Sequence, residues 1–132
     1  MIKAVCFDLD GTLVDSVRDI HLCLCTVLGR LGLEKFSVDE VKAMIGAGSK
    51  KMVGLALLKN GIIDSCAQLE EVYFDFINEY SKNPTRLTSV YPGGIEVLNN
   101  LSEQGIRLAV CTNKPRATTD PVIKKLKLQK YF

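Results

Sequence analysis

Two short apolar runs, far apart in the chain, interrupt an otherwise helical pattern of hydrophobic and polar positions. Residues 2–7 (IKAVCF) and 106–111 (IRLAVC) are nearly continuously apolar, which is typical of strands buried on both faces of a parallel sheet. Polar residues follow each run at once. Because ligands bind beyond the carboxyl ends of parallel strands, we expect the residues after both runs to converge on one crevice.

Between these runs the apolar positions recur every three to four residues, the period of an amphipathic helix. The clearest stripe is Leu69, Val72, Tyr73, Phe76, Ile77 and Tyr80. Ser37, followed three residues later by Glu40, predicts a capping box at the start of another helix. Further helices are expected over residues 20–31, after an Asp15 or Ser16 cap, and over 38–44, 50–58, 95–101 and around 122–126.

This order of elements favours an α/β core that is interrupted by a helical insertion. No convincing strand is expected over residues 16–82. A two-stranded sheet is rarely stable alone. We therefore expect a fragment, a truncated gene product, or a chain that something outside it completes.

Composition narrows the function classes. The 132 residues are 47% hydrophobic and 24% charged, with a formal net charge of +2 and no basic stretch interleaved with aromatics, which argues against nucleic-acid binding. No segment approaches the ~20 apolar residues that a membrane span needs, so a cytoplasmic protein is expected. The five cysteines have no framework spacing, which favours reduced thiols.

The candidate chemistry follows the two apolar runs. Asp8 and Asp10 can face the same side, and their mutual repulsion predicts a positive partner, which Mg²⁺ would supply through oxygen ligands. Mg²⁺ often binds a phosphate oxygen as well, so a small phosphorylated ligand is expected. Gly11 permits a close turn with backbone N–H groups towards that ligand, and Thr112 and Asn113 add donors from the second run.

Two carboxylates also suffice for a phosphoryl-transfer mechanism. One can attack phosphorus to form an aspartyl-phosphate, and the other can protonate the leaving oxygen and then deprotonate the attacking water. On structural grounds alone, residues 112–115 also fit a plain strand-to-helix turn, and Gly46 and Gly48 also fit a simple helix connection.

The segment FDLDGTLVDS, followed about a hundred residues later by VCTNK, resembles the haloacid dehalogenase-like phosphatases. The stretch MIGAGSKKMV and the YPGG turn are most similar to the phosphoglycolate phosphatase branch. The resemblance implies an α/β fold with a Rossmann-like parallel-sheet core, incomplete over this length, and an inserted α-helical cap. Residues 1–15 and 84–132 would form the core, and residues 16–83 the cap.

Residue by residue, the resemblance implies that Asp8 is the nucleophile and a Mg²⁺ ligand. Asp10 would be the general acid/base and would give the metal its backbone carbonyl. Thr112 would hold the transferring phosphoryl group with Asn113 beside it, and the loop of residues 46–49 would lean into the site as a specificity element.

Proteins of this kind also supply a lysine that steadies the phosphoryl group and a later acidic loop that completes the metal shell. This chain stops at Phe132, before either is expected. Lys114 lies one motif too early, so it is not assigned the role of that lysine.

The expected function is a Mg²⁺-dependent phosphatase that hydrolyses a small phosphomonoester, and the resemblance suggests phosphoglycolate. One alternative is a phosphoglucomutase of the same superfamily. Another is a truncated, non-catalytic fragment that binds phosphate or a partner. A response-regulator receiver is excluded, because its compact alternating fold has no place for a helical block of about 65 residues after the first strand. The oligomeric state is left open.

Overall fold

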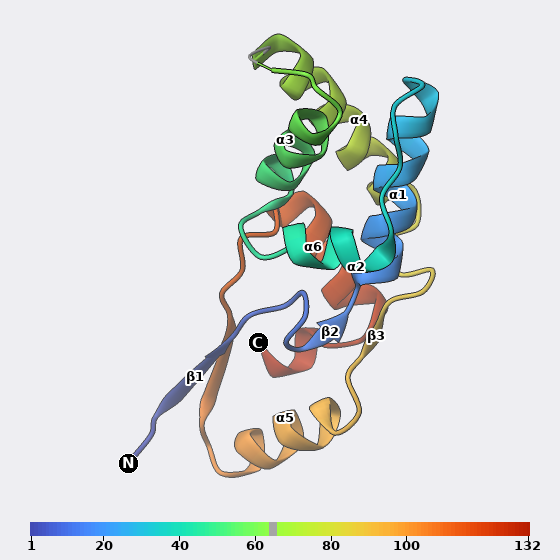
Figure 1. The fold of residues 1–132 in the computed structure, drawn as a ribbon. Helices are drawn as coiled ribbons and strands as arrows, with labels where there is room; N and C mark the ends of the chain where they lie inside the picture. Colours follow the sequence, from blue (N-terminus) through green and yellow to red (C-terminus); the bar gives the residue numbers. More distant parts are fainter. Residues whose placement is uncertain (64–65) are drawn as a thin grey trace.

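The computed structural model describes residues 1–63 and 66–132, which fold into an α/β unit and a helical block formed by four helices (Figure 1). The elements are β1 Ala4–Phe7, β2 Val14–Asp15, α1 Val17–Arg30, α2 Val38–Met44, α3 Ser49–Lys59, α4 Cys66–Lys82, β3 Ser89–Val90, α5 Gly94–Glu103, β4 Arg107–Val110, α6 Arg116–Lys125 and the 3₁₀ turn η1 Gln129–Tyr131. Helices α1 to α4 make up the helical block. The expected α/β class with a helical insertion is confirmed.

The sheet of the α/β unit brings the two apolar runs together. β1 and β4 pair in parallel, with Phe7 opposite Val110 at their carboxyl ends. The Cys111 amide continues the pairing by donating to the Phe7 carbonyl at 2.8 Å. The residues that follow the two strands therefore leave the sheet at the same edge.

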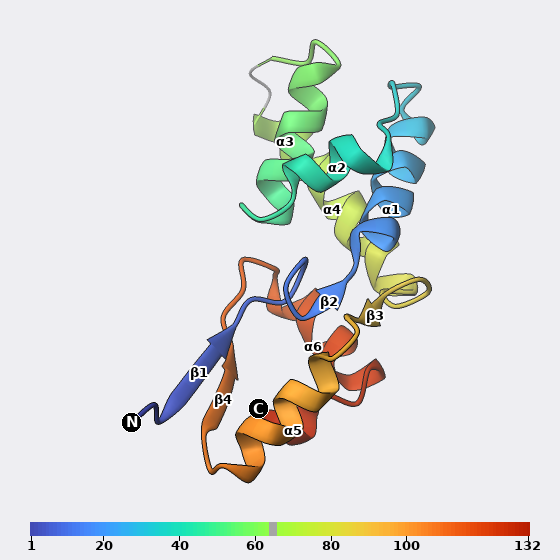
Figure 2. The same cartoon turned by 60° about the horizontal axis from the view of Figure 1, so that its bottom comes forward.

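A second, antiparallel pair joins β2 to β3, with Val14 opposite Val90 and Asp15 opposite Ser89. Figure 2 shows this pair where the chain passes between the helical block and the α/β unit. The hydrophobic pattern did not predict it, because two residues are too few to display an alternation. The two segments that connect the α/β unit with the helical block thus pair with each other at the base of the helices.

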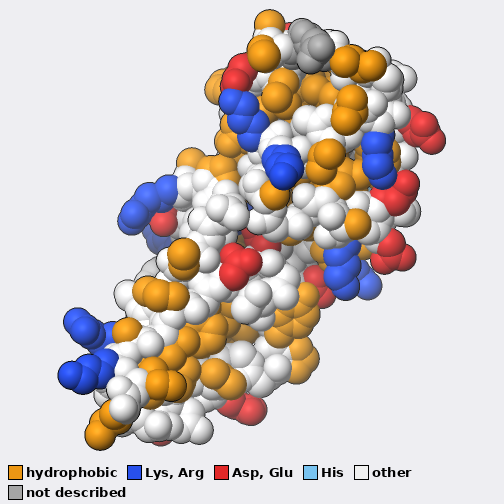
Figure 3. All heavy atoms as spheres, turned by 60° about the vertical axis from the view of Figure 1, so that its left-hand side comes forward, with side chains coloured by type: hydrophobic (Ala, Val, Ile, Leu, Met, Phe, Trp, Pro, Cys, Tyr) orange, Lys and Arg blue, Asp and Glu red, His pale blue; other side chains and the backbone are white. Residues whose placement is uncertain are grey.

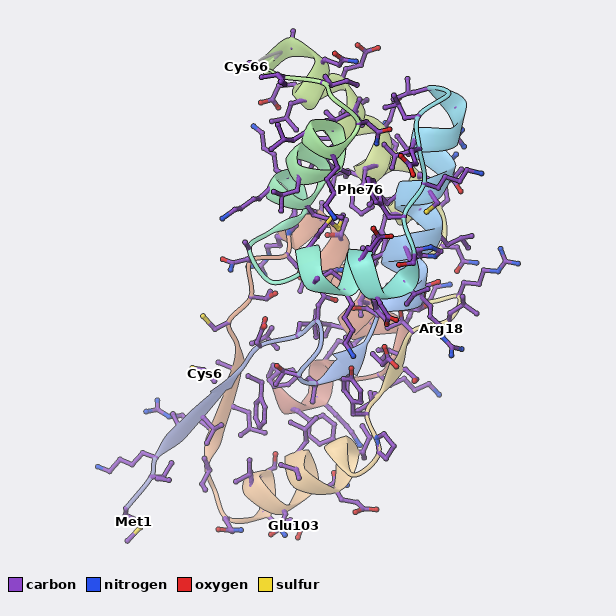
Figure 4. All side chains as sticks on the ribbon, in the orientation of Figure 1. Met1, Cys6, Arg18, Cys66, Phe76 and Glu103 are labelled. Carbon is purple, nitrogen blue, oxygen red and sulfur yellow. The ribbon has the colours of Figure 1, made fainter. Side chains whose placement is uncertain are left out.

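The expectation that β1 and β4 are buried on both faces is wrong. Phe7 and Val110 pack against the core, but Cys6 is exposed and points away from the body of the molecule (Figure 4). Within the described chain the parallel sheet has two strands, and exposed residues alternate with partly buried ones along both of them. Hydrophobic side chains consequently gather on the surface of the α/β unit, in the lower part of Figure 3.

The helical block follows its sequence pattern closely. The stripe on α4 buries Val72, Phe76 and Tyr80, and Figure 4 shows Phe76 inside the block. The capping box of Ser37 and Glu40 is confirmed at the start of α2. Among the described helices, none is long and apolar enough to cross a membrane. The division of the chain at residues 15 and 84 stays a prediction.

Candidate active site

One cavity of about 40 Å³ lies between the strand ends and the helical block. From the α/β unit, Asp8, Asp10, Thr112 and Asn113 line it, so the structure brings these four sequence-predicted residues together. From the helical block come mostly apolar and small residues, namely Ile20, Ile45, Gly46, Gly48, Ser49, Met52, Phe76 and Tyr80. A group held at the strand ends would therefore meet an apolar wall.

The turn after β1 sets the positions of the two acids. The Leu9 amide donates to Asp8 Oδ1 at 2.7 Å, and the Leu9 carbonyl accepts from the amides of Leu13 and Val14, each at 3.0 Å. Gly11 has a positive φ of 81°, which allows the chain to reverse here without strain. The turn thus presents both carboxylates to the cavity.

The amide of Gly11 is engaged within the turn, and phosphate binding at this residue stays a prediction. Its amide donates to the Val14 carbonyl at 2.9 Å, and the residue lies outside the cavity lining. The hydrogen bond that closes the turn uses the N–H that a phosphate oxygen would need. Gly11 therefore shapes the turn and, in this conformation, offers no donor of its own.

Asp10 carries two partners that sequence analysis missed. Ser16 occupies the N-cap position of α1 but caps no helix amide, and its hydroxyl donates to Asp10 Oδ1 at 2.5 Å. The Lys114 ammonium donates to both Asp10 oxygens, at 3.1 and 3.2 Å. The side chains of Asp10 and Lys114 are only 13% and 6% exposed. The Lys114 ammonium therefore supplies part of the positive charge that was predicted to balance Asp8 and Asp10.

Lys114 also touches the helical block. Its ammonium donates to the Tyr80 hydroxyl at 3.0 Å and lies 4.3 Å from the centre of the Tyr80 ring. Burial lowers the pKa of Lys114, and the Asp10 carboxylate opposes that shift. Burial, followed by the charge of Asp10, raises the pKa of Tyr80. Sequence analysis set Lys114 aside, although its place directly after Thr112 and Asn113 was a usable signal.

The loop after β4 makes a second contact with the helical block. The Asn113 side-chain amide donates to the Gly46 carbonyl at 2.9 Å, and the Lys114 amide donates to Thr112 Oγ1 at 3.1 Å. The Thr112 hydroxyl accepts this bond and keeps its own proton free to donate. The loop of residues 46–49 therefore lies against the site. Its role as a specificity element stays a prediction.

The oxygen atoms around Asp8 and Asp10 suit a hard divalent cation. In residues 1–63 and 66–132 no group of three or more His, Cys, Asp or Glu residues gathers to hold a metal. Two acids are nevertheless sufficient for Mg²⁺, which keeps several waters and takes one or two carboxylates plus a phosphate oxygen. The Asp10 backbone carbonyl accepts no hydrogen bond within the described residues, so it is free to serve as a ligand.

Other polar side chains take structural roles. The ring of His21 donates through Nε2 to the Phe36 carbonyl at 2.8 Å and lies outside the cavity lining. Cys25 is buried in the helical block, and its thiol lies 3.5 Å from the same carbonyl. Neither residue has the geometry of a catalytic group in this site.

Comparison with known proteins agrees with this arrangement. A family model for haloacid dehalogenase-like hydrolases matches residues 5–132. The chain belongs to this family. A phosphoglycolate phosphatase of Cereibacter sphaeroides is 40% identical over 119 residues, which are 90% of this chain and 55% of that protein. One of Pseudomonas fluorescens is 35% identical over 98% of this chain and 48% of its own length.

Solved structures of the family share the fold. A "predicted phosphoglycolate phosphatase" of Haemophilus somnus superposes with a TM-score of 0.87 at 30% identity, over 99% of this chain and 60% of that one. A haloacid dehalogenase-like family protein of Streptococcus pneumoniae gives a TM-score of 0.83 at 25% identity, over 99% and 59%. The chain spans about half to three fifths of the length of the relatives that it matches.

Proposed function

We propose that the protein is a Mg²⁺-dependent phosphatase that hydrolyses a small phosphomonoester through an aspartyl-phosphate on Asp8, with phosphoglycolate as the substrate to test first. The observation that carries the proposal is the meeting of Asp8 and Asp10 with Thr112 around one cavity at the strand ends. The name phosphoglycolate phosphatase, which two of the relatives carry, supports the choice of substrate.

The residues divide the chemistry between them. An Asp8 oxygen bonds to phosphorus while the bond from phosphorus to the ester oxygen breaks, and protonated Asp10 gives its proton to that leaving oxygen. Water then attacks the phosphorus of the aspartyl-phosphate and passes a proton to Asp10. The bond between phosphorus and the Asp8 oxygen breaks, which releases inorganic phosphate and restores both residues. Thr112 holds a phosphoryl oxygen through its free hydroxyl proton.

The charge around the cavity supports the need for Mg²⁺. With Asp10 protonated for the first step, its described lining holds one carboxylate and one ammonium, so it carries no net positive charge to offset a phosphomonoester dianion. Asp8 and the Asp10 carbonyl would hold the ion. Bound there, the ion would neutralise the phosphoryl oxygens and favour attack by an anionic nucleophile.

The cavity is smaller than either candidate substrate. At about 40 Å³ it has room for about three water molecules, at roughly 10–15 Å³ of this measure each. Both phosphoglycolate and a sugar phosphate would therefore require the helical block to move away from the strand ends, and the cavity volume does not distinguish them. Phosphate binding without turnover is the second candidate function, because the chain spans only part of its relatives.

Phosphate release from phosphoglycolate in the presence of Mg²⁺ tests the proposal. The wild-type protein should release phosphate into water, Asp8→Asn should not, and removal of Mg²⁺ by EDTA should stop the reaction. Asp75→Asn is the matched control, because Asp75 is exposed on α4 away from the cavity. Release that survives in Asp8→Asn would refute the assigned nucleophile, and binding of phosphoglycolate without any release would favour the non-catalytic alternative.

A further inference from the structure

Lys114 is the one basic side chain in the described lining of the cavity, and the proposed chemical steps do not use it. Its ammonium lies between Asp10 on the α/β unit and Tyr80 on the helical block. The other ion pairs of the described chain lie at the surface, with side chains 20% to 90% exposed, whereas Lys114 is 6% exposed. This lysine is therefore placed at the site rather than on a solvated face.

Burying an ammonium is costly, and a well-packed apolar side chain often serves stability equally well. The free-energy cost of burying the Lys114 ammonium is offset if the ammonium binds a second anion besides Asp10. Lysine carries three N–H donors on a flexible stem. One of them now points to the neutral Tyr80 hydroxyl, a weaker acceptor than a carboxylate. An anionic ligand in the cavity would offer Lys114 a better acceptor than Tyr80 does.

A second, independent feature lies on the opposite wall. The Ser49 hydroxyl oxygen is buried and has no hydrogen-bond partner within the described residues, although Ser49 lines the cavity. Ser49 is the first residue of α3, an 11-residue helix whose N-cap, Gly48, provides no side-chain cap. The first amides of a helix lack acceptors within it and favour negative charge. A buried hydroxyl without a partner at such an end points to a missing acceptor.

We propose that Lys114 and Ser49 together bind a carboxylate on the leaving group, so that the site selects phosphomonoesters of short hydroxy acids. The inference rests on the proposed function and names its substrate class. Asp10 serves the ester oxygen, and in phosphoglycolate one carbon separates that oxygen from the carboxylate. A group in contact with Asp10 is therefore within reach of the carboxylate of a short acid, whereas the carboxylate of a longer acid would lie farther from it.

Two substrates of nearly equal size test this selection. Phosphoglycolate and ethyl phosphate carry the same phosphoryl group and a two-carbon leaving group, but only the former has a carboxylate. Lys114→Met should lower the ratio of their kcat/KM values by about 10- to 100-fold, the range for a charge-assisted hydrogen bond. The ratio cancels any disturbance of Asp10, because both substrates depend on that residue equally. Lys124→Met, on the exposed face of α6, is the matched control and should leave the ratio unchanged.

Ser49→Ala separates ligand binding from folding. Since the hydroxyl has no partner, its removal should not lower the midpoint of thermal unfolding, yet the preference for phosphoglycolate should fall by about tenfold. Ser102→Ala, at an exposed position, is the control. If Lys114→Met and Ser49→Ala reduce activity on both substrates equally, or leave the ratio unchanged, the proposed carboxylate site is refuted.

A binding measurement keeps this test independent of turnover. Asp8→Asn with Mg²⁺ should bind phosphoglycolate more tightly than ethyl phosphate by isothermal titration calorimetry, and adding Lys114→Met should remove the difference. If neither substrate is hydrolysed but this preference appears and depends on Lys114, the proposed phosphatase activity fails and the carboxylate site stands. Equal affinities for the two ligands in Asp8→Asn overturn the site.

Discussion

The carboxylate of Asp19, in the first turn of α1, accepts a hydrogen bond of 2.5 Å from the hydroxyl of Thr88, which directly precedes β3. Asp19 also accepts the Leu87 amide, at 2.9 and 3.1 Å from its two oxygens. Asp19 and Thr88 are 2% and 7% exposed. The segment that leaves the α/β unit and the segment that returns to it are therefore joined by a buried carboxylate.

Loss of this carboxylate should destabilise the whole chain. We expect Asp19→Ala to lower the free energy of unfolding by about 2 kcal/mol, because the Leu87 amide and the buried Thr88 hydroxyl lose their acceptor. Urea denaturation measures the change, with Asp75→Ala at an exposed site as the control. In a double-mutant cycle with Thr88→Val the coupling should be about 1 kcal/mol. Strictly additive effects would mean that the two side chains do not stabilise each other.

The thiols should differ sharply in reactivity. Burial raises the pKa of Cys23 to about 11, so at pH 8 only about one in a thousand of these thiols is the reactive thiolate. Cys6, Cys66 and Cys111 are exposed. Iodoacetamide at pH 8 should modify these three first, and the rate at Cys23 should rise with pH towards 11. Peptide mass spectrometry reads each site, and modification of Cys23 as fast as Cys111 at pH 8 would contradict the burial.

Neighbouring residues of β1 provide a matched pair for the inner and outer faces of the sheet. Phe7 packs against the core, whereas Cys6 is exposed on the opposite face. Phe7→Ala should lower the free energy of unfolding by about 3 kcal/mol, near the lower limit for a large core side chain. Cys6→Ala should change it by less than about 0.5 kcal/mol. Similar losses at both positions in urea denaturation would mean that both faces are covered in solution.

The sequence pattern predicted what depends on local periodicity. The α4 stripe, the Ser37 and Glu40 capping box and the two parallel strands were all visible, because each needs only neighbours within one element. The exposure of one strand face was not predictable, since it depends on how many elements cover the sheet. The same holds for β2 and β3, which pair residues about 75 positions apart and are too short to show a period of two.

The meeting of Asp8 and Asp10 with Thr112 and Asn113 was also foreseeable, because parallel strands place their carboxyl ends at one edge. The partners of Asp10 were not. Lys114 reaches it across 104 positions of sequence, and only the rotamer of a long side chain decides whether it meets Asp10 or solvent. The contact of Ser16 with Asp10 was missed because a serine directly before a helix fits the role of an N-cap equally well.

Ser16 provides the most direct test of how Asp10 is held. Its hydroxyl is the donor to Asp10 from the base of α1, and the side chain caps no helix amide, so Ser16→Ala removes one buried hydrogen bond and no cap. We expect a loss of stability of only about 1 kcal/mol. The value of kcat should fall about tenfold, since among the described residues Lys114 alone would then hold the Asp10 side chain and would fix its position relative to the leaving oxygen less tightly.

KM for phosphoglycolate should change little in Ser16→Ala, because Ser16 lies outside the cavity lining and acts through Asp10. Ser89→Ala, at an exposed position on β3, should leave kcat and KM unchanged. Ser16→Thr keeps a hydroxyl and should restore part of the lost kcat. If it restores nothing while the protein remains folded, or if KM rises as much as kcat falls, Ser16 supports the fold around α1 and does not position the proton donor.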